Sequence, residues 1–465
     1  MPAATPSSNS VTIRLHTSPD YAVVGRIATV IAEQGGIVTA IDIADSRHDS
    51  LVVDATCSGF DVDHTDGLVA AVEAIEGVKV HKVSDRTFLL HLGGKIETTA
   101  KVPLRNRDDL SRAYTPGVAR VCMAIAKNKE DARRLTIKRN TIAVVTDGTA
   151  VLGLGDIGPE ASMPVMEGKA VLFKQFAGVD AWPVALDTKD TEEIIAICKA
   201  IAPAYGGINL EDISAPRCFE IEARLREELD IPVFHDDQHG TAIVTQAALT
   251  NALKVVGKDI GEVRVVVSGV GAAGNAIIRL LIASGAKNII ACGRNGAIEH
   301  GSEQSDEHRS WLAQNTNQEG FTGSLKEAVV GADVFIGVSA PNLLDEQDIA
   351  AMNKDAIVFA MSNPDPEVHP EAASKHAAVV ATGRSDFPNQ INNVLAFPGF
   401  FRGLLDASAS DISDEMLVVA AEAIASCIGQ DELNPGYIIP SVFDPEVSVR
   451  VAEAVARVAK PRQTA

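Results

Sequence analysis

Two short acidic segments have the residue types of a divalent-cation site. Glu211 and Asp212 follow a short apolar run, and Asp236 and Asp237 follow the apolar residues 231–234. Both pairs stand where a buried strand would end, and the carboxyl ends of parallel strands meet at one edge of a sheet. Carboxylates gathered without a basic partner are costly unless a cation binds, and oxygen ligands suit Mg²⁺ or Mn²⁺. We therefore predict a metal site formed by Glu211, Asp212 and Asp237.

A structural interpretation of these acidic pairs stays open. The second pair would suit the N-terminus of a helix over 241–256, and the first pair would suit the acidic first turn of another helix. His235 and His239 are zinc ligands by type, but no cysteines at ligand spacing accompany them. Zinc is therefore the weaker alternative to magnesium or manganese.

A glycine-rich turn lies between the strand-like run VRVVVS and the helical run NAIIRLLIAS. Its residues are Gly269, Gly271, Ala272, Ala273 and Gly274, and its glycines form GxGxxG. In a strand-turn-helix context, such a turn lets the backbone approach a pyrophosphate at the positive end of the helix. The pattern predicts dinucleotide binding.

The strand that follows this turn, NIIACGRNG, ends without a carboxylate. NAD enzymes carry Asp or Glu about 20 residues after the glycine turn, where it binds the ribose 2′-hydroxyl. Gly293 stands at that position and Arg294 follows it. The loss of a carboxylate removes repulsion against a 2′-phosphate, and a guanidinium pairs with one. We predict that NADP is preferred over NAD, with a solvated loop arginine as the alternative for Arg294.

Hydrophobic periodicity divides the chain into parts that would position these residues. Residues 10–95 read as strand, helix, strand, strand, helix, strand, with the last strand over 78–92, which predicts a ferredoxin-like βαββαβ domain. Residues 96–245 and 246–425 alternate strands with helices, which predicts an α/β substrate and metal domain followed by a Rossmann dinucleotide-binding domain. Residues 426–465 form a C-terminal helical segment.

Composition excludes several classes of partner. The chain carries 62 acidic and 41 basic residues, for a net charge of -21, which opposes binding to nucleic acid and to anionic membranes. Its six cysteines are scattered and read as reduced thiols. Neither a signal peptide nor an apolar run long enough to span a bilayer is present in the sequence. We expect a cytoplasmic protein.

Six motifs resemble those of the malic enzymes, from about residue 95 to the end of the chain. The motifs are YTPGVA (114–119), the segment that begins VVTDGTAVLGLGD (144–188), NLEDISAP (209–216), FHDDQHGTA (234–242), SNPDPE (362–367) and NVLAFPGFFRG (393–403). The resemblance is to the short bacterial form. It implies oxidative decarboxylation of L-malate to pyruvate and carbon dioxide, with a divalent metal and NADP or NAD.

The resemblance also implies roles for individual residues. The metal ligands would be Glu211, Asp212 and Asp237. Lys169 would be the general base, assisted by Asp236, and Tyr114 would be the general acid. Asn363 and Asn393 would hold the substrate and the nicotinamide. The sequence places Lys169 at the start of an apolar helix, where burial and a metal would lower its pKa. Larger relatives carry an arginine that binds malate where this chain has Ala150, which leaves Arg105 and Arg107 as candidates for that contact.

The N-terminal part resembles an ACT domain, a module that senses small molecules. That family holds its ligand beside the first strand-helix turn, here around Gly25, which would make this turn an effector site. A role of the domain as a dimerisation surface is the alternative. We expect a homodimer. The other functions to weigh are an amino-acid dehydrogenase, which would need no metal, a malolactic reaction that yields lactate, and a non-enzymatic regulatory module.

Overall fold

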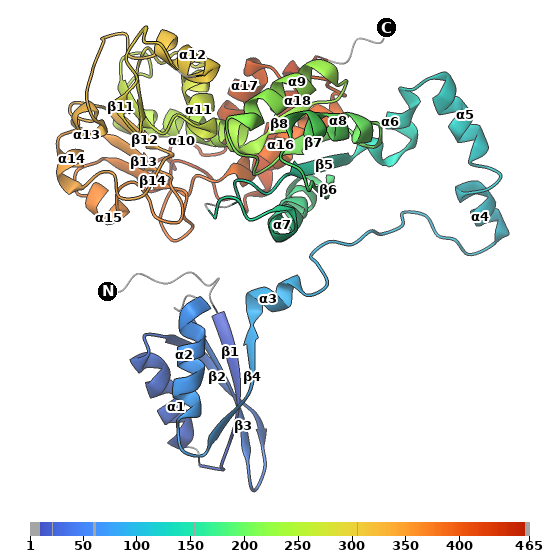
Figure 1. The fold of residues 1–465 in the computed structure, drawn as a ribbon, viewed down its shortest axis with the longest axis vertical. Coiled ribbons are helices and arrows are strands. Elements are labelled where there is room, and N and C mark those ends of the chain that lie inside the picture. The colour runs from blue at the N-terminus through green and yellow to red at the C-terminus, as the bar shows by residue number, and fades with distance from the viewer. Residues whose placement is uncertain (1–9, 21, 59–61, 152–153, 305, 461–465) are drawn as a thin grey trace. The chain divides into compact units, whose positions relative to one another are not determined.

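The computed structural model describes residues 10–20, 22–58, 62–151, 154–304 and 306–460. The chain forms two compact units, Met1–Glu97 and Thr98–Ala465, which are shown in Figure 1 and are described separately below. No helix in the described part of the chain is both long and apolar enough to cross a membrane.

The first unit is a four-stranded antiparallel sheet with two helices packed on one face. Its elements are β1 (Ser10–Thr17), α1 (Ala22–Glu33), β2 (Ile37–Ser46), β3 (Leu51–Ser58), α2 (Val62–Glu73) and β4 (Val78–Asp85), in the sheet order β2-β3-β1-β4. Alternate residues of β1, such as Ile13 and Leu15, are buried against Ile27 and Ile31 of α1. This confirms the ferredoxin-like fold, while the likeness to ACT domains stays a prediction.

The last predicted strand of this unit is wrong beyond Asp85. A short helix, α3 (Arg86–His91), replaces the strand there, although its residues are rich in β-forming and apolar types. The Asp85 carboxylate accepts hydrogen bonds from the backbone N–H groups of Thr87 (2.7 Å) and Phe88 (3.2 Å). An aspartate that caps the first turn in this way stabilises the helix over a continued strand.

The second unit contains a parallel sheet that supplies the acidic residues. Its strands are β5 (Thr141–Thr146), β6 (Asp180–Ala185), β7 (Gly207–Leu210) and β8 (Val233–His235), in the order β6-β5-β7-β8. The crossover helices are α7 (Pro159–Ala177), α8 (Thr191–Ile201) and α9 (Arg217–Glu228). Every residue of β5, β7 and β8 is buried, as a parallel sheet covered on both faces requires.

Helix α7 begins well before the predicted position. The sequence suggests a helix that starts at Lys169, but α7 begins at Pro159 and contains Pro164, so Lys169 lies in its second half. Proline fits the first turn because the backbone N–H groups there have no helical partner. Lys169 therefore projects from the interior of a long helix and not from its first turn.

A second sheet has the order β11-β10-β9-β12-β13-β14, in which all pairs but β10 with β11 are parallel. Its strands are β9 (Arg264–Ser268), β10 (Asn288–Gly293), β11 (Gly296–Ala297), β12 (Val334–Gly337), β13 (Ile357–Ala360) and β14 (Val379–Thr382). The chain passes from β9 to β10 on one side and to β12 on the other, which is the switch point of a doubly wound sheet. This confirms the Rossmann-type fold.

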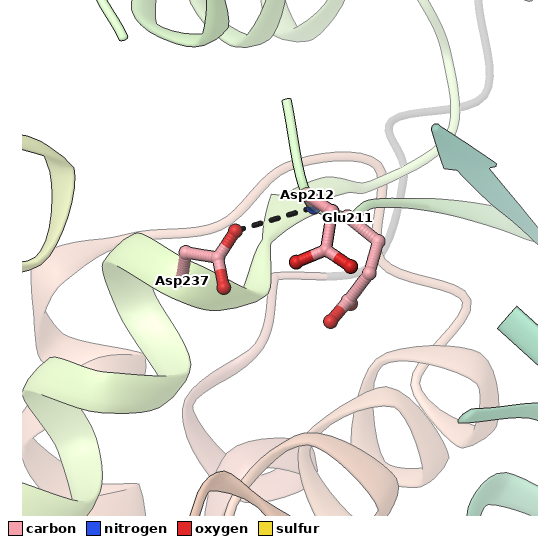
Figure 2. A group of neighbouring side chains, drawn as sticks. All are labelled: Glu211, Asp212 and Asp237. Carbon is pink, nitrogen blue, oxygen red and sulfur yellow. Dashed lines mark hydrogen bonds between the residues drawn. The ribbon is translucent and has the colours of Figure 1, made fainter. Parts of the chain in front are cut away.

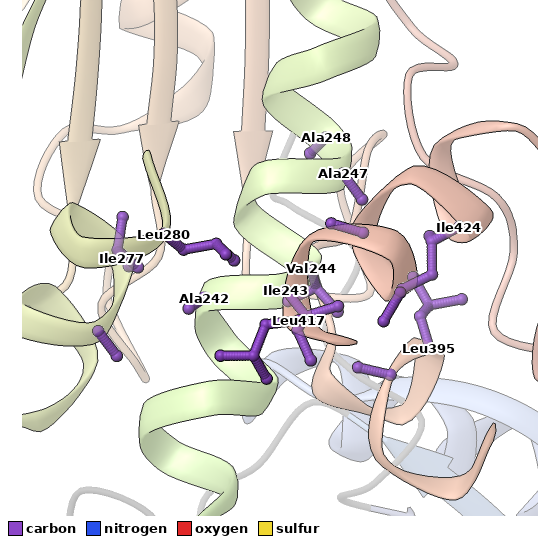
Figure 3. Packing of buried hydrophobic residues seen from close by; sticks show 14 of the residues in the cluster. Ala242, Ile243, Val244, Ala247, Ala248, Ile277, Leu280, Leu395, Leu417 and Ile424 are labelled. Atoms are coloured by element: carbon purple, nitrogen blue, oxygen red, sulfur yellow. The ribbon is translucent and has the colours of Figure 1, made fainter. Parts of the chain in front are cut away.

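Helices join the two sheets of the second unit through one continuous core. Helix α10 (Thr241–Val256) packs between α11 (Ala272–Ala283) and α17 (Asp414–Ala425), with Ala242, Leu280 and Leu417 among the contacting side chains (Figure 3). Near the C-terminus, α18 (Pro445–Val458) packs on α16 (Phe397–Asp406) and α17. The core thus spans the predicted boundary at residue 245, and the division into separate domains there stays a prediction.

Candidate active site

The three predicted carboxylates meet at the carboxyl edge of the first parallel sheet. Glu211 and Asp212 follow β7, Asp237 follows β8, and the pairing of Leu210 with His235 puts both strand ends level. One carboxylate oxygen from each residue lies within 4.8 Å of the other two (Figure 2). Three converging acidic side chains of this kind, two of them buried, suit a hard divalent cation.

The structural alternative does not hold for Glu211 and Asp212, whereas Asp236 and Asp237 do lie in a first helical turn, although neither acts as a side-chain cap. Helix α9 begins at Arg217, so Glu211 and Asp212 lie outside its first turn. Helix α10 begins after Gly240 without a side-chain cap, because Asp236 and Asp237 belong to the π-helical turn η3 (Asp236–Gly240) that precedes it.

Lys169 reaches this acidic edge from α7. Its Nζ lies 2.8 Å from Glu211 Oε1 and 2.7 Å from Asp236 Oδ2, and only 10% of its side chain is exposed. The ring of Phe397 lies below the ammonium group, with 4.2 Å between Nζ and the ring centroid. The lysine thus contacts one predicted metal ligand and one predicted assisting residue at the same time.

Asn393 also contacts this cluster, through Asp236. Its Nδ2 donates to Asp236 Oδ2 (3.1 Å) and to Thr241 Oγ1 (3.1 Å). Asn209 Nδ2 donates to Glu211 Oε2 (2.7 Å). Sequence reasoning missed Asn209, Thr241 and Phe397, because each is an ordinary strand, helix or core residue in its local sequence context.

The charges of the site shift its pKa values strongly. Burial raises the pKa of Glu211 well above its usual range, an effect that Lys169 opposes and the neighbouring aspartates reinforce. Burial and Asp237 raise the pKa of Asp212 to about 7. Burial alone would lower the pKa of Lys169, but Asp236 and Glu211 outweigh it, so this pKa is raised. The expectation of a lowered lysine pKa therefore fails for the protein without its cation.

We expect metal stabilisation to grow with pH. The folded state holds the Asp212 proton up to about pH 7, whereas an unfolded aspartate releases it near pH 4. Between these values the folded state binds more protons, so the metal-free protein loses stability as pH rises. A cation replaces that proton, so the gain in melting temperature from Mn²⁺ should be larger at pH 8 than at pH 6. An equal gain at both values would contradict this assignment.

Of the two histidines beside Asp237, His239 has a structural partner, and His235 Nε2 lies 3.6 Å from Asp237 Oδ2. His239 Nε2 lies 2.7 Å from Glu222 Oε1, and Gln238 Nε2 donates to Glu222 Oε2 (2.9 Å). Burial alone would raise the pKa of Glu222, but His239, with smaller contributions from His235 and Arg226, lowers this pKa below its usual value. His235 is fully buried, and neither histidine belongs to the cluster of possible ligands found among the described residues.

The glycine turn is built for close approach of a ligand. At Gly274 a Cβ would lie 1.7 Å from the carbonyl oxygen of Gly269, so only glycine fits between strand and helix. At Gly271, which caps α11, a Cβ would meet nothing within 4 Å. The space above Gly271 and the free N–H groups at the start of α11, from Ala272 and Ala273, suit a pyrophosphate.

Two further predicted cofactor residues lie near the carboxyl edge of the second sheet. Arg294 is exposed in the turn between β10 and β11. Asn363 follows β13, and a Cβ on Gly383 would lie 3.0 Å from its Nδ2. Both positions are compatible with nucleotide contact, and the roles stay predictions.

Tyr114 is not brought to this cluster within one chain. It caps α4 (Arg107–Ala113) and is 67% exposed. Neither α4 nor the next helix, α5 (Ala119–Lys127), buries any residue. Arg105 and Arg107 are exposed on the same segment, so the proposed acid and the proposed carboxylate contacts share one location.

The loop that carries Ala150 does lie at the acidic edge. The Ala150 N–H donates to the carbonyl oxygen of Asp212 (2.9 Å). Arg217 reaches the same loop, where it pairs with Asp147 (2.8 Å) and donates to Thr149 Oγ1 (3.1 Å). Arg217 is an arginine that sequence reasoning missed, and its charge is committed to Asp147.

A glycine turn of the dinucleotide-binding type, together with a buried acidic site that includes a lysine, defines a class, the dinucleotide-dependent α/β oxidoreductases. Two family models match the chain in order, "Malic enzyme, N-terminal domain" over residues 93–226 and "Malic enzyme, NAD binding domain" over residues 238–460. The chain belongs to the malic enzyme family.

Individual relatives agree with this assignment. The NAD-dependent malic enzyme of Geobacillus stearothermophilus is 59% identical over 450 residues, which cover 97% of this chain and 94% of that protein. The bifunctional malic/malolactic enzyme of Bacillus subtilis (strain 168) is 54% identical over 386 residues, covering 83% and 92%. The crystal structure of an NAD-dependent malic enzyme from Thermotoga maritima has a TM-score of 0.77 and 48% identity, covering 80% and 99%.

Proposed function

We propose that the protein converts L-malate to pyruvate and carbon dioxide, with a bound Mg²⁺ or Mn²⁺ and with reduction of NADP, or alternatively of NAD. The observation that carries the proposal is the contact of Lys169 with both Glu211 (2.8 Å) and Asp236 (2.7 Å). This contact supports the proposal, because the amine proposed as the base lies beside the carboxylates that suit a cation. The cytoplasmic location expected from the sequence stays a prediction.

The residues divide the chemistry among them. Glu211, Asp212 and Asp237 would hold the cation. When bound, the cation would polarise the C2 oxygen and stabilise charge during decarboxylation, and the nicotinamide would accept a hydride. Lys169 takes the proton of the C2 hydroxyl as general base. Asp236 orients the lysine, and Asn393 in turn holds Asp236.

Tyr114 is proposed as the acid that protonates C3 after carbon dioxide leaves. Because it is exposed on helices that bury nothing, we propose that it enters the site of a second copy in a homodimer. The same segment exposes large apolar side chains, including Leu104 (63%), Leu110 (49%) and Met123 (60%). Helices with an unburied apolar face favour such a partner.

The NADP preference rests on Gly293 and Arg294, and the relatives include proteins named as NAD-dependent and as NADP-dependent. If Arg294 pairs with the 2′-phosphate, Arg294→Ala should lower kcat/KM for NADP about tenfold, the loss expected for one charge-assisted hydrogen bond. The value for NAD should not change. Arg309→Ala, which removes a partly exposed arginine that lies 3.7 Å from Asp306, is the matched control. Wild-type protein that uses NAD better than NADP would overturn the preference.

The reaction itself is tested by initial rates with L-malate and Mn²⁺, with each nucleotide, and with or without EDTA. We expect pyruvate, formed only when the metal is present. Lactate as the product would favour the malolactic reaction, which the name of the Bacillus subtilis relative brings into consideration. Activity on amino acids that survives EDTA would favour a dehydrogenase of the amino-acid type, and no activity at all would favour a regulatory module.

A further inference from the structure

A buried carboxylate lies on the helix that connects the two strands with acidic ends. Glu222 belongs to α9, between β7 and β8, and only 5% of the residue is exposed. Glutamate is almost never buried to this extent unless its charge is paired or hydrogen-bonded. The catalytic and metal-binding roles proposed above do not involve it. The partners of this carboxylate therefore indicate what it does.

Both partners of the Glu222 carboxylate belong to η3, the turn that begins with Asp236 and Asp237. His239 Nε2 lies 2.7 Å from Glu222 Oε1, and Gln238 Nε2 donates to Glu222 Oε2 (2.9 Å). The first two residues of the turn make contacts within the acidic site, and the next two contact Glu222. One carboxylate thus holds the turn at the positions directly after a predicted metal ligand.

The backbone of η3 is irregular, so its position depends on such contacts. Its hydrogen bonds are π-helical, a rare geometry that is often found at functional sites. At Gly240 a Cβ would lie 2.0 Å from Asp236 Oδ1, so the turn closes tightly over that carboxylate. His235, just before the turn, is fully buried, but neither of its ring nitrogens has a hydrogen-bond partner in the described part of the chain. Among the described residues, Glu222 is the α9 side chain that hydrogen-bonds to η3.

Helix α9 also holds the other segments that form the acidic edge. Arg217, its first residue, donates to Ser214 Oγ (3.1 Å) and pairs with Asp147 (2.8 Å). Ser214 and Asp147 belong to the segments that follow β7 and β5. The first two turns of α9 therefore contact the chain after β5, β7 and β8. Loss of Glu222 would release only the segment after β8, which carries Asp237.

We propose that Glu222 is a positioning residue, which holds Asp237 in the geometry that binds the divalent cation. The inference rests on the proposed function, because it requires the cation at Glu211, Asp212 and Asp237. Groups that orient metal ligands by hydrogen bonds contribute strongly to metal affinity, although they do not touch the metal. Here the carboxylate acts through the backbone of η3, since its two partners follow Asp237 directly in the sequence.

Calorimetric titration of the full chain with Mn²⁺, without substrate, tests the proposal. Glu222→Ala should weaken Mn²⁺ binding about tenfold or more. It should leave binding of the nucleotide unchanged, measured by titration with whichever of NADP and NAD wild type binds more tightly. Glu222→Gln should recover most of the Mn²⁺ affinity, because its amide accepts from Gln238 and donates to neutral His239. Glu220→Ala, an exposed side chain on the same helix, is the matched control and should bind Mn²⁺ as wild type does.

A milder variant covers the case in which Glu222→Ala does not fold. Gln238→Ala removes one of the two hydrogen bonds and should weaken Mn²⁺ binding about three- to tenfold. Mn²⁺ affinities equal to that of wild type in the alanine variants would overturn the inference. So would an equal loss of Mn²⁺ and nucleotide affinity, which a general loss of stability produces, or Glu222→Gln that binds Mn²⁺ as weakly as Glu222→Ala. Wild type that binds no Mn²⁺ would instead overturn the proposed function, and the inference with it.

Discussion

Replacing Lys169 with alanine is expected to lower kcat by about a thousandfold, the scale of a lost general base. The amine lies within hydrogen-bond distance of a predicted metal ligand and of Asp236, so the substitution removes the proposed base from beside the predicted cation site. Lys174→Ala is the matched control, because this lysine lies on the same helix but pairs with Asp180 at the surface (2.6 Å). Initial rates at saturating malate, nucleotide and Mn²⁺ measure both variants.

A second readout separates chemistry from folding. Without metal, Lys169→Ala leaves Glu211 and Asp236 buried without their cation, which should cost roughly 3 kcal/mol of stability. Added Mn²⁺ should restore much of that loss, because the cation takes the place of the ammonium near Glu211. A folded, metal-loaded variant that keeps more than about a tenth of the wild-type kcat would remove the lysine from the role of base.

Mixing two inactive variants is expected to restore activity if Tyr114 acts across the dimer. Tyr114→Phe removes the acid, and Lys169→Ala removes the base. In a two-fold dimer with statistical exchange, half the dimers are mixed and each mixed dimer has one intact site, so about one quarter of the wild-type activity should return in the mixture and about one half in the mixed dimers alone. Subunit exchange is followed with two different affinity tags, and pyruvate formation is measured on the doubly tagged fraction.

The control for this experiment carries both changes in one chain. Tyr114→Phe mixed with the double variant Tyr114→Phe, Lys169→Ala contains no intact tyrosine and should stay inactive. If the two single variants exchange subunits and remain inactive together, the tyrosine serves its own chain, and the segment with α4 must fold back to do so.

Much of the acidic site could be predicted, because its residues lie next in sequence to the strands that position them. Glu211, Asp212 and Asp237 each follow a buried strand, and parallel strands that are neighbours in a sheet bring their carboxyl ends together. The glycine turn at 269–274 is equally predictable, because the spacing of its glycines between a strand and a helix specifies one backbone geometry. In both cases the informative residues lie within a few positions of the element that places them.

The rest depends on contacts that local patterns do not carry. Lys169 and Asp236 are 67 positions apart, so the ion pair that raises the lysine pKa is visible only in the folded chain. The apolar pattern does not show that α7 starts at Pro159, because proline is accepted in the first turn of a helix. It also does not show the helix after Asp85, because the aspartate cap stabilises that helix over a strand. For Tyr114, the sequence suggests a role but contains no signal for which chain supplies it.

The ammonium of Lys169 acts as a built-in placeholder ion. It offsets part of the negative charge of Glu211 and Asp236, so the chain can reach its native state before it meets a metal. A cation that arrives later must share Glu211 with the lysine or displace it. If the cation displaces the amine, metal binding would also release the proposed base from one of its two carboxylates. Metal supply would then set how many molecules have that base available.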